Sequence, residues 1–202
     1  MSIIVLGNGP SVLNNKYGKY IDKFDEVVRI NHYKPEFKEY IGDKLTTYVT
    51  TTYNTIFYPK VLKKTNEILI LDDINYKISL YDSYEKTKYI DKTLINPYLL
   101  KHGFNIIPKK PWATTGIIIL LYLIEVKKYN KIIIHGFDNL IVGKKEHCFE
   151  NNFVNNSPHS SILEKNFINH FINKGIFIKL DDYIIQKNNE KLNQKRILIL
   201  KR

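Results

Sequence analysis

The sequence predicts an α/β protein in which a mostly parallel sheet carries helices on both faces, as in a Rossmann-like domain. Short β-branched runs alternate along the chain with segments of helical pattern, and this order is typical of parallel sheets. The length of 202 residues fits one domain, so residues 1–202 are expected to form a single unit. No internal repeat and no linker-like stretch divides the sequence.

Seven short runs rich in β-branched or apolar residues are predicted to be strands. They cover residues 3–6, 27–30, 45–52, 68–71, 132–134, 176–180 and 197–200. Gly7, Asn31, Thr51 and Gly136 fall at the carboxyl ends of such runs. In open parallel sheets, ligands bind at the carboxyl ends of the strands, so these positions are the first candidates for a site.

Segments of helical pattern connect the predicted strands. Residues 116–128 are apolar and end in a basic turn, which the helix dipole favours. A second helix is expected from Pro158 to Lys174, with Gly175 as its C-terminal stop. A weaker helical pattern with many tyrosines covers residues 79–100 and predicts a partly helical lid or insertion within residues 75–110. The remaining stretches, 137–158 and 186–195, are expected to be polar surface segments.

Composition excludes several classes of protein. The hydrophobic content of 44% supports a packed core, and the longest apolar stretch, residues 117–124, is too short to span a membrane. The N-terminus lacks the basic and cleavable regions of a secretory signal, and a lone cysteine cannot form an internal disulfide, so a cytoplasmic location is expected. The net charge of +11 is spread along the chain, which disfavours nucleic-acid binding. Basic residues gather only from Lys187 to Arg202, where a peripheral membrane contact remains open.

A loop that follows the first predicted strand is a candidate anion site. It contains Gly7, Asn8, Gly9 and Ser11, and free backbone N–H groups at a helix start attract phosphate. Val12 stands where a dinucleotide-binding loop has its third glycine. Asn31 ends the second strand, where its amide suits ribose hydroxyls or phosphate. A structural turn is an equally good interpretation of both the loop and Asn31.

The start of the apolar helix is a second candidate. Thr114, Thr115 and Gly116 offer two hydroxyls and open backbone at a helix N-terminus, which suits a carboxylate or a phosphate. An ordinary N-cap is the structural alternative.

His159 is the candidate general base, because the pKa of a histidine lies near neutrality and this one falls in the first turn of a predicted helix. Glu164 follows in the next turn and is expected to be catalytic together with His159. A cap or surface histidine remains the alternative. His147 and Cys148 lie upstream, but the spacing needed for a zinc site or an activated thiolate is missing. Asp72-Asp73 and Asp181-Asp182 are interpreted as turn residues, so no metal site is predicted.

Taken in order, these segments resemble the motifs of the sialyltransferase family of glycosyltransferases, in its animal group. The long motif of that family is similar to residues 4–8, to the pattern YGxxIDxFDxVxRIN from Tyr17 to Asn31, and to residues 42–47. The short motif resembles residues 114–116 and 134–137, the third resembles residues 147–150, and the very small motif His-x4-Glu matches His159 and Glu164. Bacterial sialyltransferases share a similar Gly-Asn-Gly-Pro-Ser start and are a second match.

The resemblance implies a GT-A-like sialyltransferase fold and an inverting, metal-independent transfer without a cofactor. The substrates would be a CMP-sugar donor and a glycan or glycolipid acceptor, and residues 75–110 would shape the acceptor site. Asn8 and Asn31 would hold the CMP ribose and phosphate, and Thr114 to Gly116 the cytidine or the sugar carboxylate. His147 would stabilise the departing phosphate, and His159 would deprotonate the acceptor.

Departures from the family pattern indicate a cytoplasmic bacterial or viral enzyme. Ile3 stands where animal members have a cysteine, no cysteine follows Gly116, and Cys148 replaces an aromatic residue of the third motif. Three alternatives stay open: a transferase that uses another CMP-sugar such as CMP-Kdo, a non-catalytic nucleotide- or polyanion-binding protein, and a dehydrogenase-like dinucleotide binder. The last is disfavoured by Val12 and by Asn31, which stands where such proteins have an acid.

Overall fold

A computed structural model describes residues 1–32, 34–51, 65–72, 85–91, 95–104, 113–138, 148 and 161–200. Within them lies one seven-stranded sheet whose neighbouring strands are all parallel, in the order β5-β4-β3-β2-β1-β6-β7. The α/β fold class predicted from the sequence is therefore confirmed. The strands are β1 (Ile3–Leu6), β2 (Glu26–Ile30), β3 (Thr47–Thr50), β4 (Glu67–Asp72), β5 (Thr87–Asp91), β6 (Ile132–His135) and β7 (Phe177–Lys179).

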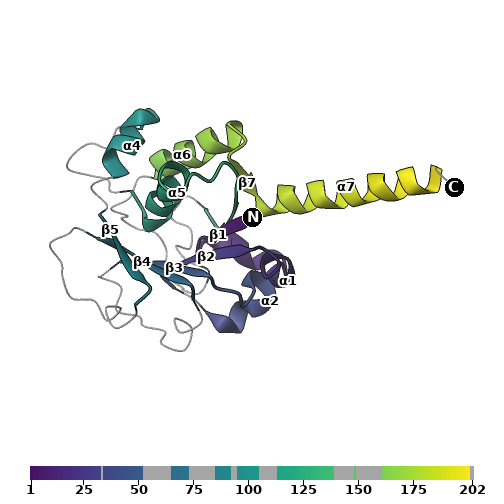
Figure 1. The fold of residues 1–202 in the computed structure, drawn as a ribbon, viewed down its shortest axis with the longest axis horizontal. Helices are drawn as coiled ribbons and strands as arrows, with labels where there is room; N and C mark the ends of the chain where they lie inside the picture. Colours follow the sequence, from purple (N-terminus) through teal and green to yellow (C-terminus); the bar gives the residue numbers. More distant parts are fainter. Residues whose placement is uncertain are drawn as a thin grey trace.

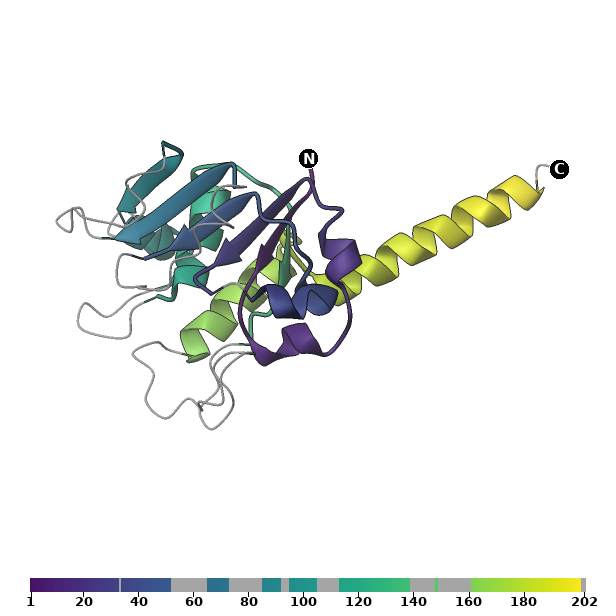
Figure 2. The same ribbon diagram turned by 90° about the horizontal axis from the view of Figure 1, so that it is seen from below.

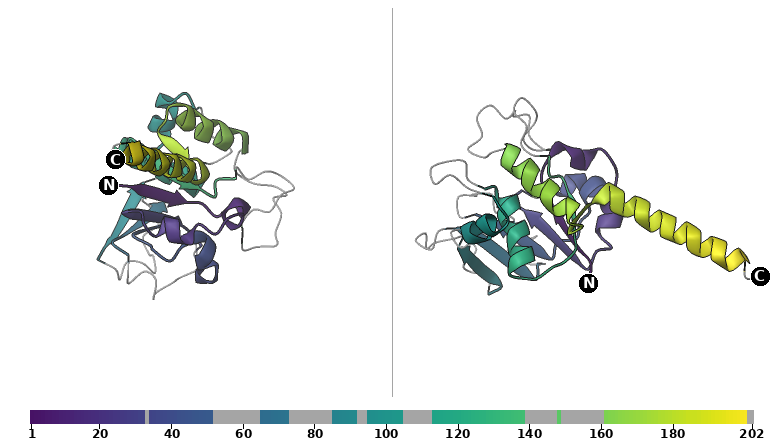
Figure 3. Two further views of the ribbon diagram at one scale, coloured as in Figure 1. Left: turned by 90° about the vertical axis from the view of Figure 1, so that its right-hand side faces the viewer. Right: turned by 90° about the horizontal axis from the view of Figure 1, so that it is seen from above.

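Helices cover both faces of the sheet (Figures 1 and 3). Side chains alternate between the faces, so Ile3 and Val5 of β1 join one apolar cluster while Ile4 and Leu6 join the other. The first cluster packs under α4 (Asn96–Lys101), α5 (Thr115–Glu125) and α6 (Ser161–Asn173). The opposite face carries η1 (Pro10–Leu13), α1 (Gly18–Ile21), η2 (Pro35–Phe37), α2 (Lys38–Ile41) and the first turn of α7 (Leu180–Leu200).

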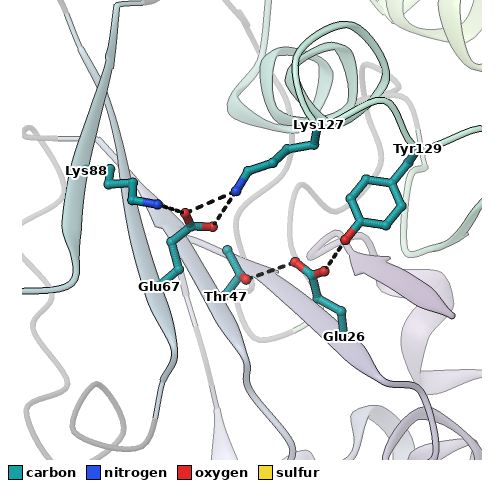
Figure 4. Close-up of polar contacts among 6 residues, drawn as sticks. All are labelled: Glu26, Thr47, Glu67, Lys88, Lys127 and Tyr129. Carbon is teal, nitrogen blue, oxygen red and sulfur yellow. Dashed lines mark hydrogen bonds and ion pairs between the residues drawn. The ribbon is translucent and has the colours of Figure 1, made fainter. Parts of the chain in front are cut away.

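The amino-terminal edge of the sheet is held by a polar network that Figure 4 shows in detail. Lys88 and Lys127 bond to Glu67 at 2.7 and 3.2 Å, and the Tyr129 hydroxyl donates to Glu26. Burial disfavours the charged form of Glu67, but the bonds from the two lysines outweigh it and hold its pKa below the usual value. This network ties the turn after α5 to β2 and β4, at the edge opposite the candidate site.

The chain changes direction across the sheet between β1 and β6. It runs outward from β1 through β2 to β5 and then returns to place β6 on the other side of β1. The backbones stay in contact beyond the strands: the Gly7 N–H donates to His135 O at 2.8 Å, and the Gly9 N–H donates to Gly136 O at 3.0 Å. Gly136 has φ 76°, and a Cβ added there would lie 2.4 Å from Val12 Cγ1 and 2.7 Å from Gly7 O. Only glycine permits this approach.

Two predicted elements in the middle of the chain differ from the structure. The strand expected over 45–52 is shortened to β3. Within residues 79–100, which the sequence predicts to be helical, residues 87–91 form strand β5. Of the described residues in this segment, those of α4 are helical. Strand β5 lies at the edge of the sheet, where only Ile90 is buried, so it lacks the apolar run that marks the inner strands. Most of residues 75–110 lie outside the described residues.

The C-terminal prediction is wrong. The polar segment 186–195 and the strand 197–200 are both part of α7, and Leu180 begins this helix instead of ending a strand. A short apolar run does not by itself distinguish a strand from a helix, and no neighbouring strand is present here for pairing. Helix α6 begins at Ser161 in the described residues, and Gly175, with φ 70°, follows its end as predicted. Pro158 and nearly all of 137–158 lie outside the described residues.

We expect Gly136→Ala to destabilise the protein much more than Gly103→Ala. Both glycines have a positive φ, 76° and 80°, but nothing lies within 4 Å of a Cβ at Gly103. The control variant Gly103→Ala should therefore lose only about 1 kcal/mol of stability, because alanine disfavours a positive φ. Gly136→Ala should lose about 1–3 kcal/mol more, because its Cβ would overlap neighbouring atoms. Urea unfolding measures both variants. Equal midpoints would show that the contact between the ends of β1 and β6 is not needed for stability.

Candidate functional site

Three segments from distant parts of the sequence meet at the carboxyl-terminal edge of the sheet. They are the loop after β1, the residues after β6 and the N-terminus of α5, and the ring of Phe137 lies among them. A Cβ added at Gly116 would lie 2.9 Å from Phe137 Cε1, and one added at Gly7 would lie 3.4 Å from Cδ2 of the same ring. The two glycine-containing motifs are thus brought together, as the sequence predicts.

The backbone of the loop after β1 is bonded inside the protein. Besides the donors at Gly7 and Gly9, the Ser11 N–H donates to Asp138 Oδ2 at 2.7 Å. The Asp138 carboxylate therefore takes the place at the start of η1 that the sequence assigns to an anion. These three N–H groups are not available to a phosphate, so the reason for the predicted role of Gly7, Gly9 and Ser11 does not hold. Any contact that these residues make with a ligand stays a prediction.

Asn8 and Asn31 lie at the ends of adjacent strands. The Asn8 Nδ2 donates to Ile30 O at 2.8 Å, which joins the loop to the end of β2. Asn31 has φ 54°, a conformation that asparagine tolerates well, and its N–H donates to Val49 O at 2.7 Å. Within the described residues the Asn31 Oδ1 is buried and has no hydrogen-bond partner. A buried acceptor without a partner is costly, so this oxygen is a candidate ligand contact.

A pocket opens beside Asn8 at the carboxyl ends of β1 and β2. It is small and partly open to solvent. Arg29, His32 and Lys34 are among its lining residues. Arg29 is buried and donates to Ile41 O and Lys44 O, so its charge is held in place. The other lining residues are Leu6, Gly7, Asn8, Val12, Phe37, Ile41 and Cys148.

Cys148 brings a further motif to this pocket. Its N–H donates to Asn8 O at 2.8 Å, so the segment that resembles the third family motif contacts the loop after β1. His147, the predicted phosphate contact, lies outside the described residues, and so does His159. The predicted roles of both histidines stay predictions. Among the described residues, no three histidine, cysteine or acidic side chains are grouped as they would be to hold a metal ion.

The N-termini of α5 and α6 lie together on the same edge (Figure 3). Thr114 caps α5, with its Oγ1 accepting from the Ile117 N–H at 3.3 Å. Glu164 of α6 is buried, and its Oε1 accepts from the Thr114 N–H at 3.2 Å. Glu164, expected to be catalytic, thus holds the cap of α5 in the described structure. Thr115 and Gly116 form the first turn of α5 beside it.

Sequence reasoning gave no role to several residues of this edge. His135 and Phe137 lie within residues 134–137, which resemble the short motif, but neither was named as a site residue. Asp138 was not identified, and its position after a strand end was the one available indication. His135 is also buried here, and burial lowers its pKa despite the opposing charges of Asp181 and Asp138. It therefore stays neutral near pH 7 behind the loop.

Removing the Glu164 carboxylate is expected to loosen the start of α5. In Glu164→Ala the half-buried Thr114 N–H loses its acceptor, a loss worth about 1 kcal/mol, whereas Glu164→Gln keeps an oxygen there and loses less. Asn166→Ala, an exposed change on the same helix, is the control. Chemical unfolding compares the three variants. If Glu164→Ala unfolds at the wild-type midpoint, the bond to Thr114 contributes nothing.

Several solved structures share the fold of this chain. A mammalian sialyltransferase in complex with Gal-beta-1-3GalNAc-ortho-nitrophenol superposes with a TM-score of 0.63 at 14% identity, covering 89% of this chain and 68% of that one. The sialyltransferase CstII from Campylobacter jejuni, in complex with CMP-3FNeuAc, gives 0.60 at 16% identity, with 89% and 82% covered. CST-II with a trisaccharide acceptor and CMP gives 0.57 at 18% identity, with 89% and 81% covered. At such low sequence identity, these TM-scores show a shared fold and nothing beyond it.

The assignment to a family comes from the sequence model of glycosyltransferase family 29, the sialyltransferases, which matches residues 2–176. No curated protein sequence matches the chain. Because the family model covers most of the chain, this protein is a glycosyltransferase that belongs to family 29, the sialyltransferase family.

Proposed function

We propose that this protein transfers sialic acid, or a closely related acid sugar, from a CMP-linked donor to a glycan hydroxyl, with inversion and without a metal ion. The observation that carries the proposal is the meeting of Gly7, Phe137 and Gly116 at one edge of the sheet. This contact brings the segments that resemble the long and short motifs of the family together at one edge of the sheet. Residues 75–110 are assigned to the acceptor side.

The residues that line the pocket beside Asn8 include groups that suit a nucleoside monophosphate. Arg29 and Lys34 supply positive charge for a phosphate. The partnerless Asn31 Oδ1 offers an acceptor for a ribose hydroxyl. CMP and CMP-3FNeuAc are the nucleotides in the CstII complexes of similar fold. These observations support CMP as the carrier of the sugar.

His159 is assigned as the general base. Its ring nitrogen would take the proton of the acceptor hydroxyl while that oxygen attacks the anomeric carbon from the face opposite CMP. The bond from the anomeric carbon to the phosphate oxygen breaks, and CMP leaves with the electron pair. Because CMP is a good leaving group, positioning and stabilisation of the phosphate charge, to which we assign His147, suffice without a metal.

The described part of α6 supports this role. Residue 159 is two positions before Ser161, so the chain limits the distance between their Cα atoms to about 7 Å. The bond between Glu164 and Thr114 fixes the start of α6 against the start of α5. The start of α6, which follows His159 by two residues, therefore lies at the edge where the pocket opens. A helix N-terminus also disfavours a charged histidine, which keeps the neutral base available.

Replacing His159 by alanine is expected to abolish turnover and leave donor binding intact. General-base catalysis contributes about 100- to 10,000-fold in rate, while the nucleotide contacts proposed above lie elsewhere. Turnover of CMP-sialic acid is measured with EDTA present, because no metal is proposed, and CMP binding is measured by calorimetry. Asn169→Ala, exposed on α6, is the control. Full activity of His159→Ala would refute this assignment.

Ligand-induced stabilisation tests the donor class. We expect CMP to raise the unfolding temperature with the logarithm of its concentration, corresponding to about 2.7 kcal/mol at 100 times the dissociation constant. CDP, UDP, NAD and heparin serve as comparisons, and turnover with CMP-Kdo separates the possible donor sugars. Stabilisation by heparin alone would favour polyanion binding and contradict the proposal.

A further inference from the structure

The last helix, α7, leaves the body after its first turn and projects into solvent (Figures 1 and 2). Its start is anchored, since Leu180 is fully buried and the Tyr17 hydroxyl donates to Asp181 Oδ1 at 2.6 Å. From residue 185 to residue 197 every residue is exposed. Of the helices in the described residues, none has both the length and the apolar character of a membrane span.

The projecting part of α7 has little to stabilise it within the chain. Helices in proteins owe most of their stability to tertiary packing, which the exposed residues 185–197 lack, and Asn188, Asn189 and Asn193 have low helix propensity. A surface that binds this segment would supply the missing stabilisation.

Charge is segregated along α7. The acids Asp181 and Asp182 lie in the turn next to the body. Beyond them Glu190 is the one acid, and it is paired with Lys187 at 2.8 Å. The projecting part carries the bases Lys187, Lys191, Lys195 and Arg196, and the sequence continues with Lys201 and Arg202. Such a basic segment is attracted to anionic lipid headgroups, and each Lys or Arg near the surface raises the affinity about fivefold.

Apolar residues accompany these bases. Ile185, Leu192 and Ile197 are 58%, 56% and 53% exposed. The sequence Ile197-Leu198-Ile199-Leu200 at the far end is bracketed by Lys195-Arg196 and Lys201-Arg202. The helix has no continuous apolar face, so a bilayer contact would depend on its basic side chains, which reach headgroups, and on the apolar residues at its far end.

A second copy of the chain fits α7 less well. Ile185, Leu192 and Ile199 recur every seven positions, as one half of a coiled-coil seam would. The positions between them, where the other half would lie, hold Asn188, Asn189, Lys195 and Arg196. A helix pair built on this face would bury amides and like charges.

We propose that α7 docks the protein on an anionic lipid bilayer, with its basic side chains at the headgroups and its apolar end in the interface. Combined with the proposed function, this contact brings the transferase to acceptors carried on lipids. The docking itself depends on α7 alone, so a failure of the proposed activity leaves it testable.

Sedimentation of the full chain with vesicles tests the docking. We expect partition onto phosphatidylcholine vesicles that contain phosphatidylserine, little onto phosphatidylcholine alone, and release at high salt. The triple variant Lys191→Glu, Lys195→Glu, Arg196→Glu is expected to bind about 100-fold more weakly or worse. Ile197→Ser is expected to weaken binding by about 10-fold.

The matched control is Lys19→Glu, Lys23→Glu, Lys131→Glu, which makes the same charge change at exposed sites of the body. It should bind vesicles like the wild type, and every variant should keep the stabilisation by CMP. Equal weakening by both triple variants would overturn the proposal, as would equal partition onto neutral vesicles. It would also be overturned by binding to RNA without vesicle binding, or by a dimer in light scattering that only the α7 variant dissociates.

Discussion

The site depends on the close approach of two backbones at the centre of the sheet. Beyond β1 and β6 the chains continue to exchange hydrogen bonds, and the carbonyl of Gly7 lies where a side chain at Gly136 would be. In many parallel sheets a crevice opens at this change of direction and receives the ligand. Here, within the described residues, backbone and the Asp138 carboxylate occupy part of this position. A pocket lies one strand away, beside Asn8 at the ends of β1 and β2.

Stability and chemistry are separated between the two edges of the sheet. At the amino edge, the lysines on Glu67 and the bond from Tyr129 to Glu26 fix the end of α5 (Figure 4). Burial, with Glu26 beside it, raises the pKa of the Tyr129 hydroxyl, so it stays a donor across the physiological range. With its far end fixed, α5 presents its N-terminus at the carboxyl edge, where backbone N–H groups favour a negative charge.

The sequence predicted those parts of the fold whose local pattern and tertiary environment agree. Inner strands such as β1 and β4 are buried on both faces and therefore appear as continuous apolar runs. The edge strand β5 buries Ile90 and exposes its neighbours, so its pattern is weak. At the site, the loop at Gly7 and the cap at Thr114 were recognisable from local residue types. The bond from Ser11 to Asp138 was not, because it joins residues 127 positions apart and no local pattern records it.

The polar groups near the pocket bear on how the proposed donor would be held. The Nδ2 of Asn8 donates one hydrogen to Ile30 O, so this amide keeps a second N–H and its oxygen for a ligand. Asn31 offers a buried oxygen without a partner in the described residues. Oxygen acceptors attract hydroxyl donors and repel phosphate oxygens. In the proposed donor complex, Asn31 therefore suits a ribose hydroxyl, whereas Asn8 can donate to a phosphate or accept from the ribose, and Arg29 and Lys34 of the pocket lining suit the phosphate.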